Sequence, residues 1–257
     1  MNKFLLSSYT LASREVLRFL RQRNRVMGAL GQPLLFWLLL GFGFKATFQL
    51  QGTSINYVQF FFPGIINLIL LFTAIFSTFS LIEDRNEGFL QGVLVSPVSR
   101  SSIVFGKVLG GSFIALLHAG LFLIFIPFIN LSLSVLDIMA LLGIMFLVAF
   151  TLTSFGFCLA WKMDSTQGFH AIMMLVLMPL WFLSGAFFPS TGLTPALAWL
   201  MKLNPLTYAV DATKHILFKK FEPSLVDLPS LELCLMVIIF FGVIVFALSL
   251  LFVRKKG

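Results

Sequence analysis

The chain has 257 residues, of which 59% are hydrophobic and only 11% are charged, and its formal net charge is +8. Soluble domains usually carry about 25% charged residues, so the composition excludes an ordinary soluble protein and requires that much of the apolar surface face lipid. The positive charge alone would suit a nucleic-acid-binding protein, but the distribution of that charge along the chain argues against such a partner.

Six apolar runs approach or exceed the ~17–25 residues that a helix needs to cross a bilayer. None of them alternates as a barrel strand does, so the sequence predicts an all-α integral membrane protein with six transmembrane helices. We read the whole chain, 1–257, as one membrane domain. The predicted spans are residues 26–44, 58–82, 108–129, 136–161, 169–188 and 233–253.

The basic residues follow these spans. With the N-terminus inside, thirteen of the 18 Lys and Arg residues fall in segments on the inner side, whereas the acidic residues divide evenly, five and five. This positive-inside pattern predicts that both termini are cytoplasmic, and it explains the net charge without nucleic acid. The five cations predicted to lie outside are Lys45, Lys202, Lys214, Lys219 and Lys220.

Residues 1–25 precede the first span and predict an amphipathic helix that lies in the inner membrane interface. A helix packed on other protein is the alternative. We expect the arginines to occupy the wet face, with Arg14, Glu15 and Arg18 opposite the apolar stripe and Arg21 following them. The apolar stripe recurs at three- and four-residue spacing, at Leu5, Tyr9, Ala12, Val16 and Leu20.

Three residues within the predicted spans have side chains that could be ionised or reactive. His118 stands alone in the third span, with no carboxylate in a neighbouring span interior, so we expect a neutral packing histidine and not a proton relay. Cys158 and Cys234 are predicted near opposite membrane faces, too far apart for a disulfide.

The connector 83–107, EDRNEGFLQGVLVSPVSRSSIVFGK, carries charges of both signs between two uncharged apolar runs. A polar connector with Gly and Pro is expected to lie in water or against a soluble partner. At its end, Gly106 and Gly110 have the four-residue spacing that permits close approach of another helix.

The segment 189–232 is predicted to be outside and to hold two short helices in or dipping into the outer leaflet. Thr194–Pro195 and Asn204–Pro205 each place a capping residue before proline. Tyr208 is a residue type typical of the headgroup level, and a mobile solvated loop is the alternative. After Pro205 one helix face is predicted to carry Leu206, Val210, Thr213 and Leu217.

The chain shows no catalytic constellation. Its three histidines lie in different segments without metal-ligand spacing, and Gly106–Lys107 lacks the glycine that precedes a phosphate-binding loop. The span interiors also lack the acidic residues that ion-coupled transporters use. We therefore expect no enzyme activity and no cofactor in this chain, and an energy source in a partner.

Two stretches resemble a known family. Residues 83–107 are similar to its acidic–arginine, Glu-Gly, Ser-Pro-Val-Ser-Arg and Gly-Lys pattern, and LSGAFFP at 183–189 followed by LNPLTYAVDATK at 203–214 is similar to a second motif. The family is that of the type 2 ABC exporter permeases, which includes drug-efflux, nodulation-factor and polysaccharide exporters. The six-span layout and the amphipathic start also match, so the resemblance covers nearly the whole chain.

The resemblance implies a half-transporter in the lipid bilayer of a prokaryotic inner membrane. Two permease copies, expected to be a homodimer, would work with a cognate ATPase subunit that binds the ATP. In such families the inner loop after the second span forms a helix that docks on the ATPase. Carried over to this chain, Glu83, Asp84, Arg85, Glu87 and Gly88 start that element and Ser96–Pro97 ends it.

This chain has Phe89 and Gln91 where the family often has Thr and Glu, which changes the polar contacts that the element makes. We expect an amphipathic or lipid-like substrate, because nothing in the spans would pair with a strongly charged one. A membrane scaffold that recruits a soluble protein through 83–107 and transports nothing is the alternative. An intramembrane enzyme is a third reading, against which the missing catalytic groups count.

Overall fold

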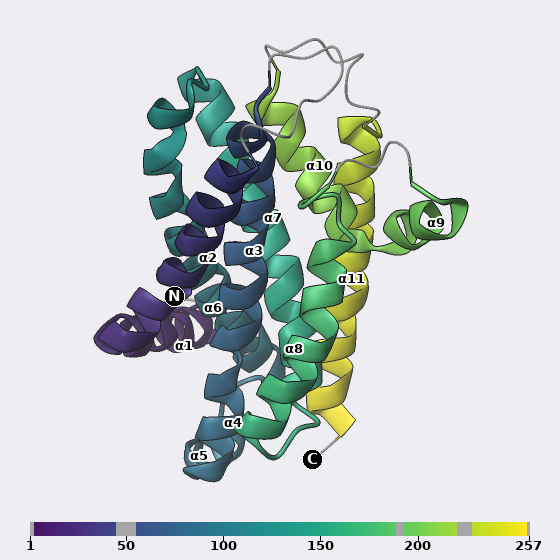
Figure 1. Cartoon of the computed structure of the whole chain (residues 1–257). Helices are drawn as coiled ribbons and strands as arrows, with labels where there is room; N and C mark the ends of the chain where they lie inside the picture. The colour runs from purple at the N-terminus through teal and green to yellow at the C-terminus, as the bar shows by residue number, and fades with distance from the viewer. Residues whose placement is uncertain (1–2, 45–54, 189–192, 220–227, 256–257) are drawn as a thin grey trace.

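The computed structural model describes residues 3–44, 55–188, 193–219 and 228–255, and the described residues form helices and no strand. Figure 1 shows them as an elongated bundle with α1 set across it. The elements are α1 Lys3–Arg21, α2 Arg23–Gly43, α3 Tyr57–Ser77, α4 Phe79–Asn86, α5 Phe89–Val95, α6 Arg100–Phe122, the 3-10 helix η1 Leu123–Ile129, α7 Val135–Ala160, α8 Thr166–Phe182, α9 Pro195–Leu203, α10 Pro205–Leu217 and α11 Leu231–Lys255.

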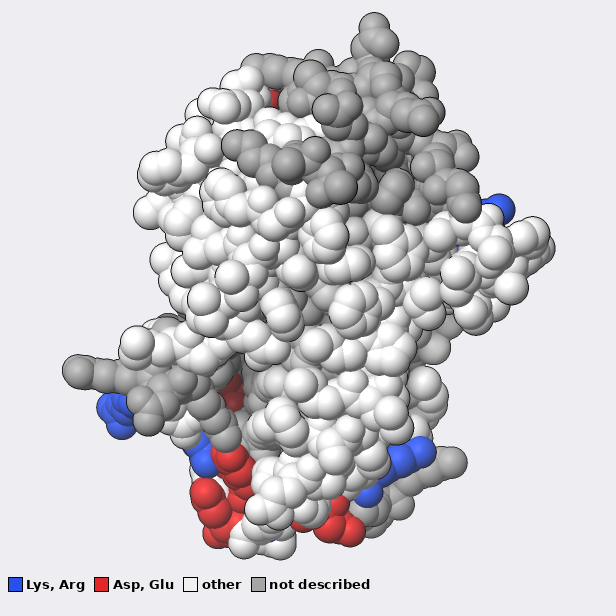
Figure 2. All heavy atoms as spheres, viewed as in Figure 1, with Lys and Arg blue, Asp and Glu red and all other residues white. Residues whose placement is uncertain are grey.

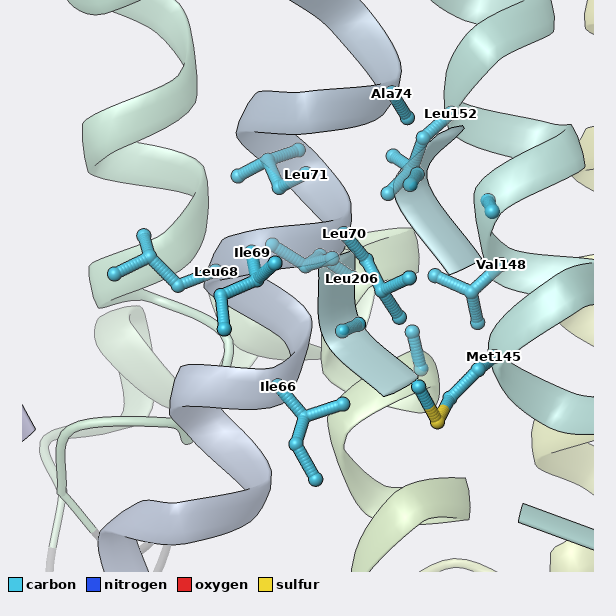
Figure 3. Close-up of a cluster of buried hydrophobic side chains, with 14 of the residues drawn as sticks. Ile66, Leu68, Ile69, Leu70, Leu71, Ala74, Met145, Val148, Leu152 and Leu206 are labelled. Atoms are coloured by element: carbon cyan, nitrogen blue, oxygen red, sulfur yellow. The ribbon is translucent and has the colours of Figure 1, made fainter. Parts of the chain in front are cut away.

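The bundle is built around α3. A helix that is apolar on every side has to be buried on every side, and nearly all side chains of α3 are buried. Helices α2, α6, α7, α8 and α10 pack around it. Figure 3 shows part of this core, where side chains of α3 meet Met145 and Val148 of α7 and Leu206 of α10.

Four helical stretches of the described chain are long and apolar enough to cross a membrane: Tyr57–Asn86, Arg100–Ile129, Val135–Ala160 and Leu231–Arg254. The other two predicted spans coincide with α2 and α8, whose apolar parts, Leu30–Gly43 and Thr166–Phe182, are shorter. At 1.5 Å per residue, 17 residues cover about 26 Å, less than the ~30 Å of hydrocarbon in a typical bilayer. The all-helical, membrane-spanning prediction is confirmed, and length supports four of the six predicted spans.

The two helices predicted in 189–232 begin at the predicted prolines, as α9 and α10. Asn204 caps α10 by accepting from the Leu206 backbone N–H at 3.0 Å, and its amide donates to the carbonyls of Leu180 and Leu183 near the end of α8. Thr194 precedes α9 but makes no capping hydrogen bond, contrary to expectation. The Tyr208 hydroxyl donates to the Lys202 carbonyl at 2.9 Å.

The predicted apolar face of α10 is buried, as expected for a helix packed on α3, α7 and α11. Residues 45–54, 189–192 and 220–227 lie outside the described residues, and with them Lys45, Lys220 and the beginning of the predicted outer segment.

His118 packs inside the protein as predicted, and the two cysteines are unpaired as predicted; the neutral state of His118 stays a prediction. His118 is 3% exposed, its Nδ1 lies 3.1 Å from the Ile114 carbonyl, and the Phe19 ring of α1 packs edge-on against it. Cys158 and Cys234 are both buried free thiols.

Candidate functional site at the charged end

Charged side chains gather at one end of the molecule, where α4, α5 and the C-terminal end of α11 lie; we call this the charged end. Figure 2 shows red and blue atoms concentrated there, below a surface that is almost entirely uncharged on the face in view. Helix α1 crosses the bundle just above this end (Figure 1).

Close packing on α6 holds α1 in place. A Cβ atom added to Gly106 would lie 2.7 Å from the Ser8 carbonyl oxygen, and one added to Gly110 would lie 2.8 Å from Cβ of Glu15. Ser8 and Ala12 of α1 are buried at this contact. The predicted close helix approach at this glycine pair therefore exists, and it joins α6 to α1 of the same chain.

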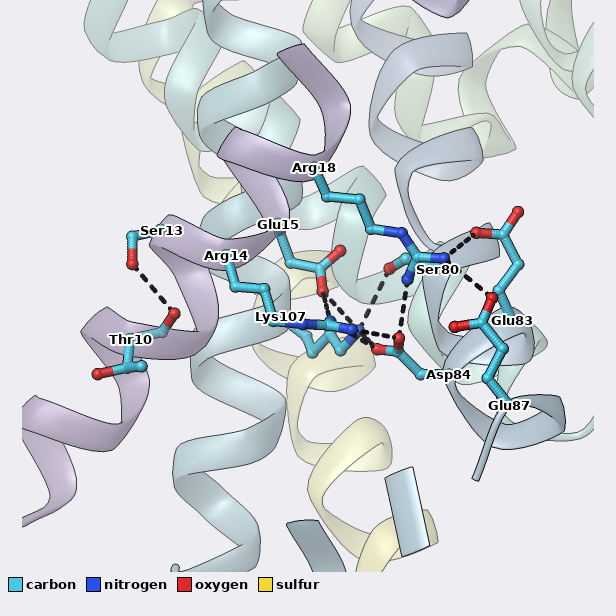
Figure 4. Close-up of polar contacts among 10 residues, drawn as sticks. All are labelled: Thr10, Ser13, Arg14, Glu15, Arg18, Ser80, Glu83, Asp84, Glu87 and Lys107. Atoms are coloured by element: carbon cyan, nitrogen blue, oxygen red, sulfur yellow. Dashed lines mark hydrogen bonds and ion pairs between the residues drawn. The ribbon is translucent and has the colours of Figure 1, made fainter. Parts of the chain in front are cut away.

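Beside this contact, α1, α4 and α6 bring together a set of ionised side chains, which we call the ionic cluster and which Figure 4 shows. Arginines of α1 reach toward the carboxylates at the end of α4, and a lysine of α6 lies between them. The cluster consists of Arg14, Glu15, Arg18, Glu83, Asp84, Glu87 and Lys107, with the hydroxyl of Ser80.

Asp84 is the centre of the ionic cluster, and its side chain is fully buried. Arg14 binds it in a bidentate pair, with Nη2–Oδ1 at 2.8 Å and Nη1–Oδ2 at 3.0 Å. Arg18 donates to the same Oδ1 at 2.8 Å, and Lys107 donates to Oδ2. These hydrogen bonds to Asp84 raise the pKa of Arg14 above its usual value. Three cations from two helices thus fix one carboxylate of a third.

Lys107 is the most deeply buried cation of the cluster, and only 6% of it is exposed. Its Nζ donates to Glu15 at 2.6 Å, to Asp84 and to the Ser80 hydroxyl at 3.3 Å. A buried charge is tolerated only when its hydrogen-bonding capacity is met by partners, and the three donors of an ammonium group find three acceptors here. Lys107 therefore links all three helices.

The ionic cluster corrects two predictions. Arg14 and Arg18 do not occupy a wet face, because their side chains turn to α4 and are only 30% and 24% exposed. Arg21 is exposed. The beginning of the 83–107 connector does not lie in water either: Glu83 and Asp84 belong to the last turns of α4, and Lys107 at its other end is buried.

Arg85 ties α4 to a different neighbour. Its guanidinium donates to the carbonyls of Trp161 at 2.7 Å and Met163 at 3.0 Å, where α7 ends, and to Asp164 at 3.2 Å. Adjacent residues on α4 therefore contact opposite partners, Asp84 the α1 side and Arg85 the α7 side. Helix α4 is therefore held both by α1 and by the end of α7.

Gly88 ends this helix and starts the next. Its φ of +80° is a left-handed conformation that side chains disfavour. A helix is present where the family resemblance implied a docking element, but this helix, α5, begins after Gly88 and not at Glu83. Within α5, Leu90 is buried and Val95 is 87% exposed, and the Arg14 guanidinium lies 3.7 Å from the Phe89 ring centroid.

After α5, Ser96 and Pro97 lead to Ser99, which caps α6 by accepting from the Ser102 N–H. We call residues 87–99 the exposed segment. Its exposed residues are Glu87, Gly88, Phe89, Gln91, Gly92, Val95, Pro97 and Ser99. In the described part of the chain, no three His, Cys, Asp or Glu side chains are grouped as a metal site requires.

Sequence reasoning missed Lys107 and Glu15 as members of the site. Their signal was a charge on a face otherwise made for helix packing: Lys107 stands between Gly106 and Gly110, and Glu15 follows the small residues Ser8 and Ala12 at helical spacing.

Comparison with known proteins relates this arrangement to one family. The model of the ABC-2 type transporter family matches residues 7–218, which include α1, the ionic cluster, the exposed segment and α10. The chain belongs to the ABC-2 type transporter family. As a member it is a membrane-spanning permease subunit of an ABC transporter, and it is not itself the catalytic subunit.

Individual proteins similar to the chain are named transport permeases, in agreement with the family assignment. The chain is 29% identical over 216 residues to a transport permease named ycf38 from Cyanophora paradoxa, covering 83% of this chain and 74% of the relative. It is 30% identical over 210 residues to the protein of the same name from Pyropia yezoensis, covering 80% and 72%. It is 28% identical over 158 residues to the inner membrane transport permease YhhJ of Escherichia coli, covering 61% and 42%.

Proposed function

We propose that this ABC-2 permease is an exporter subunit that works as a homodimer with a separate ATPase in a prokaryotic inner membrane. The chain would cross the bilayer six times with both termini in the cytoplasm. Its substrate would be amphipathic or lipid-like. ATP would be bound by the partner ATPase and not by this chain.

The path of the short helices supports six crossings. Helix α2 leads from α1 to the end of the bundle opposite the charged end, and α8 leads from beside α4 toward that same opposite end (Figure 1). Each therefore has to traverse the apolar body, although its apolar part is short. A local thinning of the bilayer or flanking polar residues accommodates such a mismatch at modest cost.

The observation that carries the proposal is an exposed helix held rigidly at the charged end. Helix α5 presents Val95 and Gly92 outward, while Leu90 is buried and the preceding helix is fixed by the ionic cluster. A surface with exposed apolar residues on a well-anchored element suits a protein partner. We infer that the exposed segment is the surface that contacts the ATPase.

The contacts of α4 supply a route by which a push on α5 reaches the membrane helices. In this proposal Glu87, Gly88 and Pro97 lie in the ATPase contact. Asp84 passes displacement to α1 through Arg14 and Arg18, and Arg85 passes it to the end of α7. The buried members of the ionic cluster are positioning residues, because their hydrogen bonds are all made within the chain.

A second copy would complete the substrate path. Six membrane helices that include a buried α3 leave little interior room, so a path is better formed between two copies than within one. In the proposed roles for the opposite leaflet, Asn204 holds the start of α10 against the end of α8, Pro205 opens α10, and Tyr208 ties α10 to α9.

The test uses the chain purified with its ATPase and reconstituted in vesicles. A Cβ atom at Gly92 would meet nothing within 4 Å, so Gly92→Arg leaves the permease fold intact and adds bulk only outside it. We expect Gly92→Arg to abolish co-purification of the ATPase and substrate-stimulated ATP hydrolysis. Gln167→Arg, an exposed position just after the other inner loop, is the control and should retain both. Full hydrolysis and co-purification in Gly92→Arg would contradict the proposal, because the ATPase would then dock elsewhere. Co-purification without substrate-stimulated hydrolysis in the parent chain would favour a scaffold role.

A further inference from the structure

A second polar site lies at the charged end and shares no residue with the ionic cluster. It is a cavity of about 350 Å³ enclosed by α4, α5, the start of α6 and the ends of α7 and α11. Its polar groups come from four elements, and its apolar side is formed by α5 and α11. The residues that matter are Arg85, Gln91, Leu94, Arg100, Trp161 and Val253.

Two guanidinium groups line this cavity with donors to spare. Arg100 donates through Nη1 alone, to the carbonyls of Arg254 at 2.9 Å and Val253 at 3.4 Å. A guanidinium carries five N–H donors. Within the described residues, Arg100 has no carboxylate partner, and the carboxylate that Arg85 contacts, Asp164, is 93% exposed. The first helical residue of α6 is Arg100 itself, and a helix N-terminus adds positive partial charge.

Trp161 contributes a donor that the protein leaves unused. Trp161 is 4% exposed, its ring stacks on Phe157, and the Arg85 guanidinium lies 5.5 Å from the ring centroid. Its buried Nε1–H has no hydrogen-bond partner among the described residues. An unsatisfied buried donor is costly. Nε1 is covered in this structure, so an acceptor bound in the cavity would reach it after a small rotation of the indole ring and would then remove that cost.

The side chains around the cavity indicate which kind of molecule would supply the acceptor. Leu94, Val95 and Val253 make the rest of the cavity wall apolar. Helix α11, which ends beside the cavity, leaves most of its apolar surface uncovered, with 28% of its most apolar stretch buried. Exposed Lys162 and Arg254 stand at the same level. Cations next to a lipid-facing helix end, above an apolar wall, are suited to a lipid headgroup whose chains continue along the helices.

We propose that this cavity binds the phosphate group of an anionic phospholipid of the inner leaflet. Trp161 Nε1, the free donors of Arg100 and the Gln91 amide are the groups that would bind the phosphate oxygens. The proposal rests on the proposed orientation, with the charged end inside, but it concerns the permease alone and requires neither the ATPase nor transport.

The test is native mass spectrometry of the full chain in neutral detergent with phosphatidylglycerol, phosphatidylcholine or inorganic phosphate added. We expect the chain to retain phosphatidylglycerol at least tenfold more tightly than phosphatidylcholine, with millimolar inorganic phosphate unable to displace it. Trp161→Phe keeps the stacked ring and the net charge, so general attraction to an anionic surface is unchanged. Losing one hydrogen bond to a charged acceptor should nevertheless weaken retention roughly tenfold.

Arg100→Gln should weaken retention at least as much as Trp161→Phe. Arg254→Gln removes the same charge at an exposed position outside the cavity and should have a smaller effect than either. Thermal unfolding in lipid-free detergent shows whether each variant is folded. If Trp161→Phe does not fold, lipid retention by Arg100→Gln is the test of the proposal. Equal retention by Trp161→Phe and the parent chain would overturn the proposal. So would displacement by inorganic phosphate, which would identify a free-phosphate site. An acidic ATPase side chain as the true occupant would leave the purified permease without lipid selectivity, which also overturns the proposal.

Discussion

Arg14 and Asp84, 70 residues apart in the sequence, form a bidentate ion pair with N–O distances of 2.8 and 3.0 Å. The carboxylate is fully buried, whereas 30% of the arginine side chain is exposed. The pair joins α1 to α4, at the charged end of the helical stretch Tyr57–Asn86. In the proposed mechanism it is the contact through which a displacement of the exposed segment would reach α1.

Asp84→Asn tests how much this centre stabilises the permease. The change leaves Arg14, Arg18 and Lys107 around a neutral group, and removing one partner of a buried ion pair costs about 3–5 kcal/mol. Glu87→Gln is the control, because the Glu87 side chain is 60% exposed and exposed pairs contribute about 0–1 kcal/mol. Thermal unfolding in detergent should show a large loss for Asp84→Asn and almost none for Glu87→Gln. Similar losses would mean that Asp84 is not buried within the folded permease.

Lys107 and Glu15 should show strong coupling. Lys107→Met alone leaves two carboxylates, Glu15 and Asp84, without the ammonium between them, and we expect a loss of about 3–5 kcal/mol in stability. Lys107→Met combined with Glu15→Leu removes both charges, and replacing both partners of a buried pair by apolar groups is often close to neutral. The double variant should therefore be more stable than the single one. Additive losses in this double-mutant cycle would contradict a direct contact.

Gly110→Val tests the packing of α1 on α6. The new side chain would start 2.8 Å from Cβ of Glu15 and 3.0 Å from the Ala12 carbonyl oxygen, so α1 has to move away. The readout is a thiol at Ser8→Cys, which is 2% exposed in the parent and should become reactive. Gly120→Val lies on the same helix with nothing within 4 Å and should leave the thiol protected. A protected thiol in both variants would show that α1 packs elsewhere.

Gly88→Ala tests the junction between α4 and α5. A residue with a Cβ at φ +80° costs about 1–2 kcal/mol, and we expect α5 to shift, so that ATPase stimulation falls while insertion is retained. Asn tolerates this conformation better, so Gly88→Asn should keep more of the stimulation than Gly88→Ala. Gly92→Ala, in open space on the same short helix, is expected to behave as the parent. An equal effect at both glycines would remove the conformational explanation.

Thiol labelling tests the proposed orientation on a clean background, since Cys158 and Cys234 are both buried. Val95→Cys, at a position that is 87% exposed, should resist an impermeant thiol reagent in intact cells that lack the ATPase and should react in inverted vesicles. Lys202→Cys, exposed on α9, should show the opposite pattern. Labelling of Val95→Cys in intact cells would reverse the topology.

The elements of the fold could be predicted from the sequence where the signal is local. Uncharged runs predict helices, and the prolines at 195 and 205 correctly mark where α9 and α10 begin. Which helix becomes the centre is not a local property: α3 and α11 are both strongly apolar, yet the former is buried and the latter faces outward. Helix packing decides this difference, and composition does not report it.

The candidate site could likewise be predicted from the sequence only in part. Residues 83–88 stand out as charged and are placed at the charged end, but their partners are 23 to 79 residues distant and come from α1, α6 and the end of α7 with the residues after it. Helical periodicity showed that Arg14 and Arg18 share a face. It did not show whether water or a buried carboxylate meets that face, so the prediction of a wet face was wrong.

The packing of α1 on α6 sets an order on biosynthesis. Ser8 and Ala12 meet the backbone at Gly106 and Gly110, so the first helix to be made cannot take its place until about a hundred further residues have followed it from the ribosome. Until then Leu11 and Ala12, which are buried in the finished fold, lack the helix that covers them. Helix α1 therefore reaches its place only after α2 to α5 have been made, although it precedes all of them in the sequence.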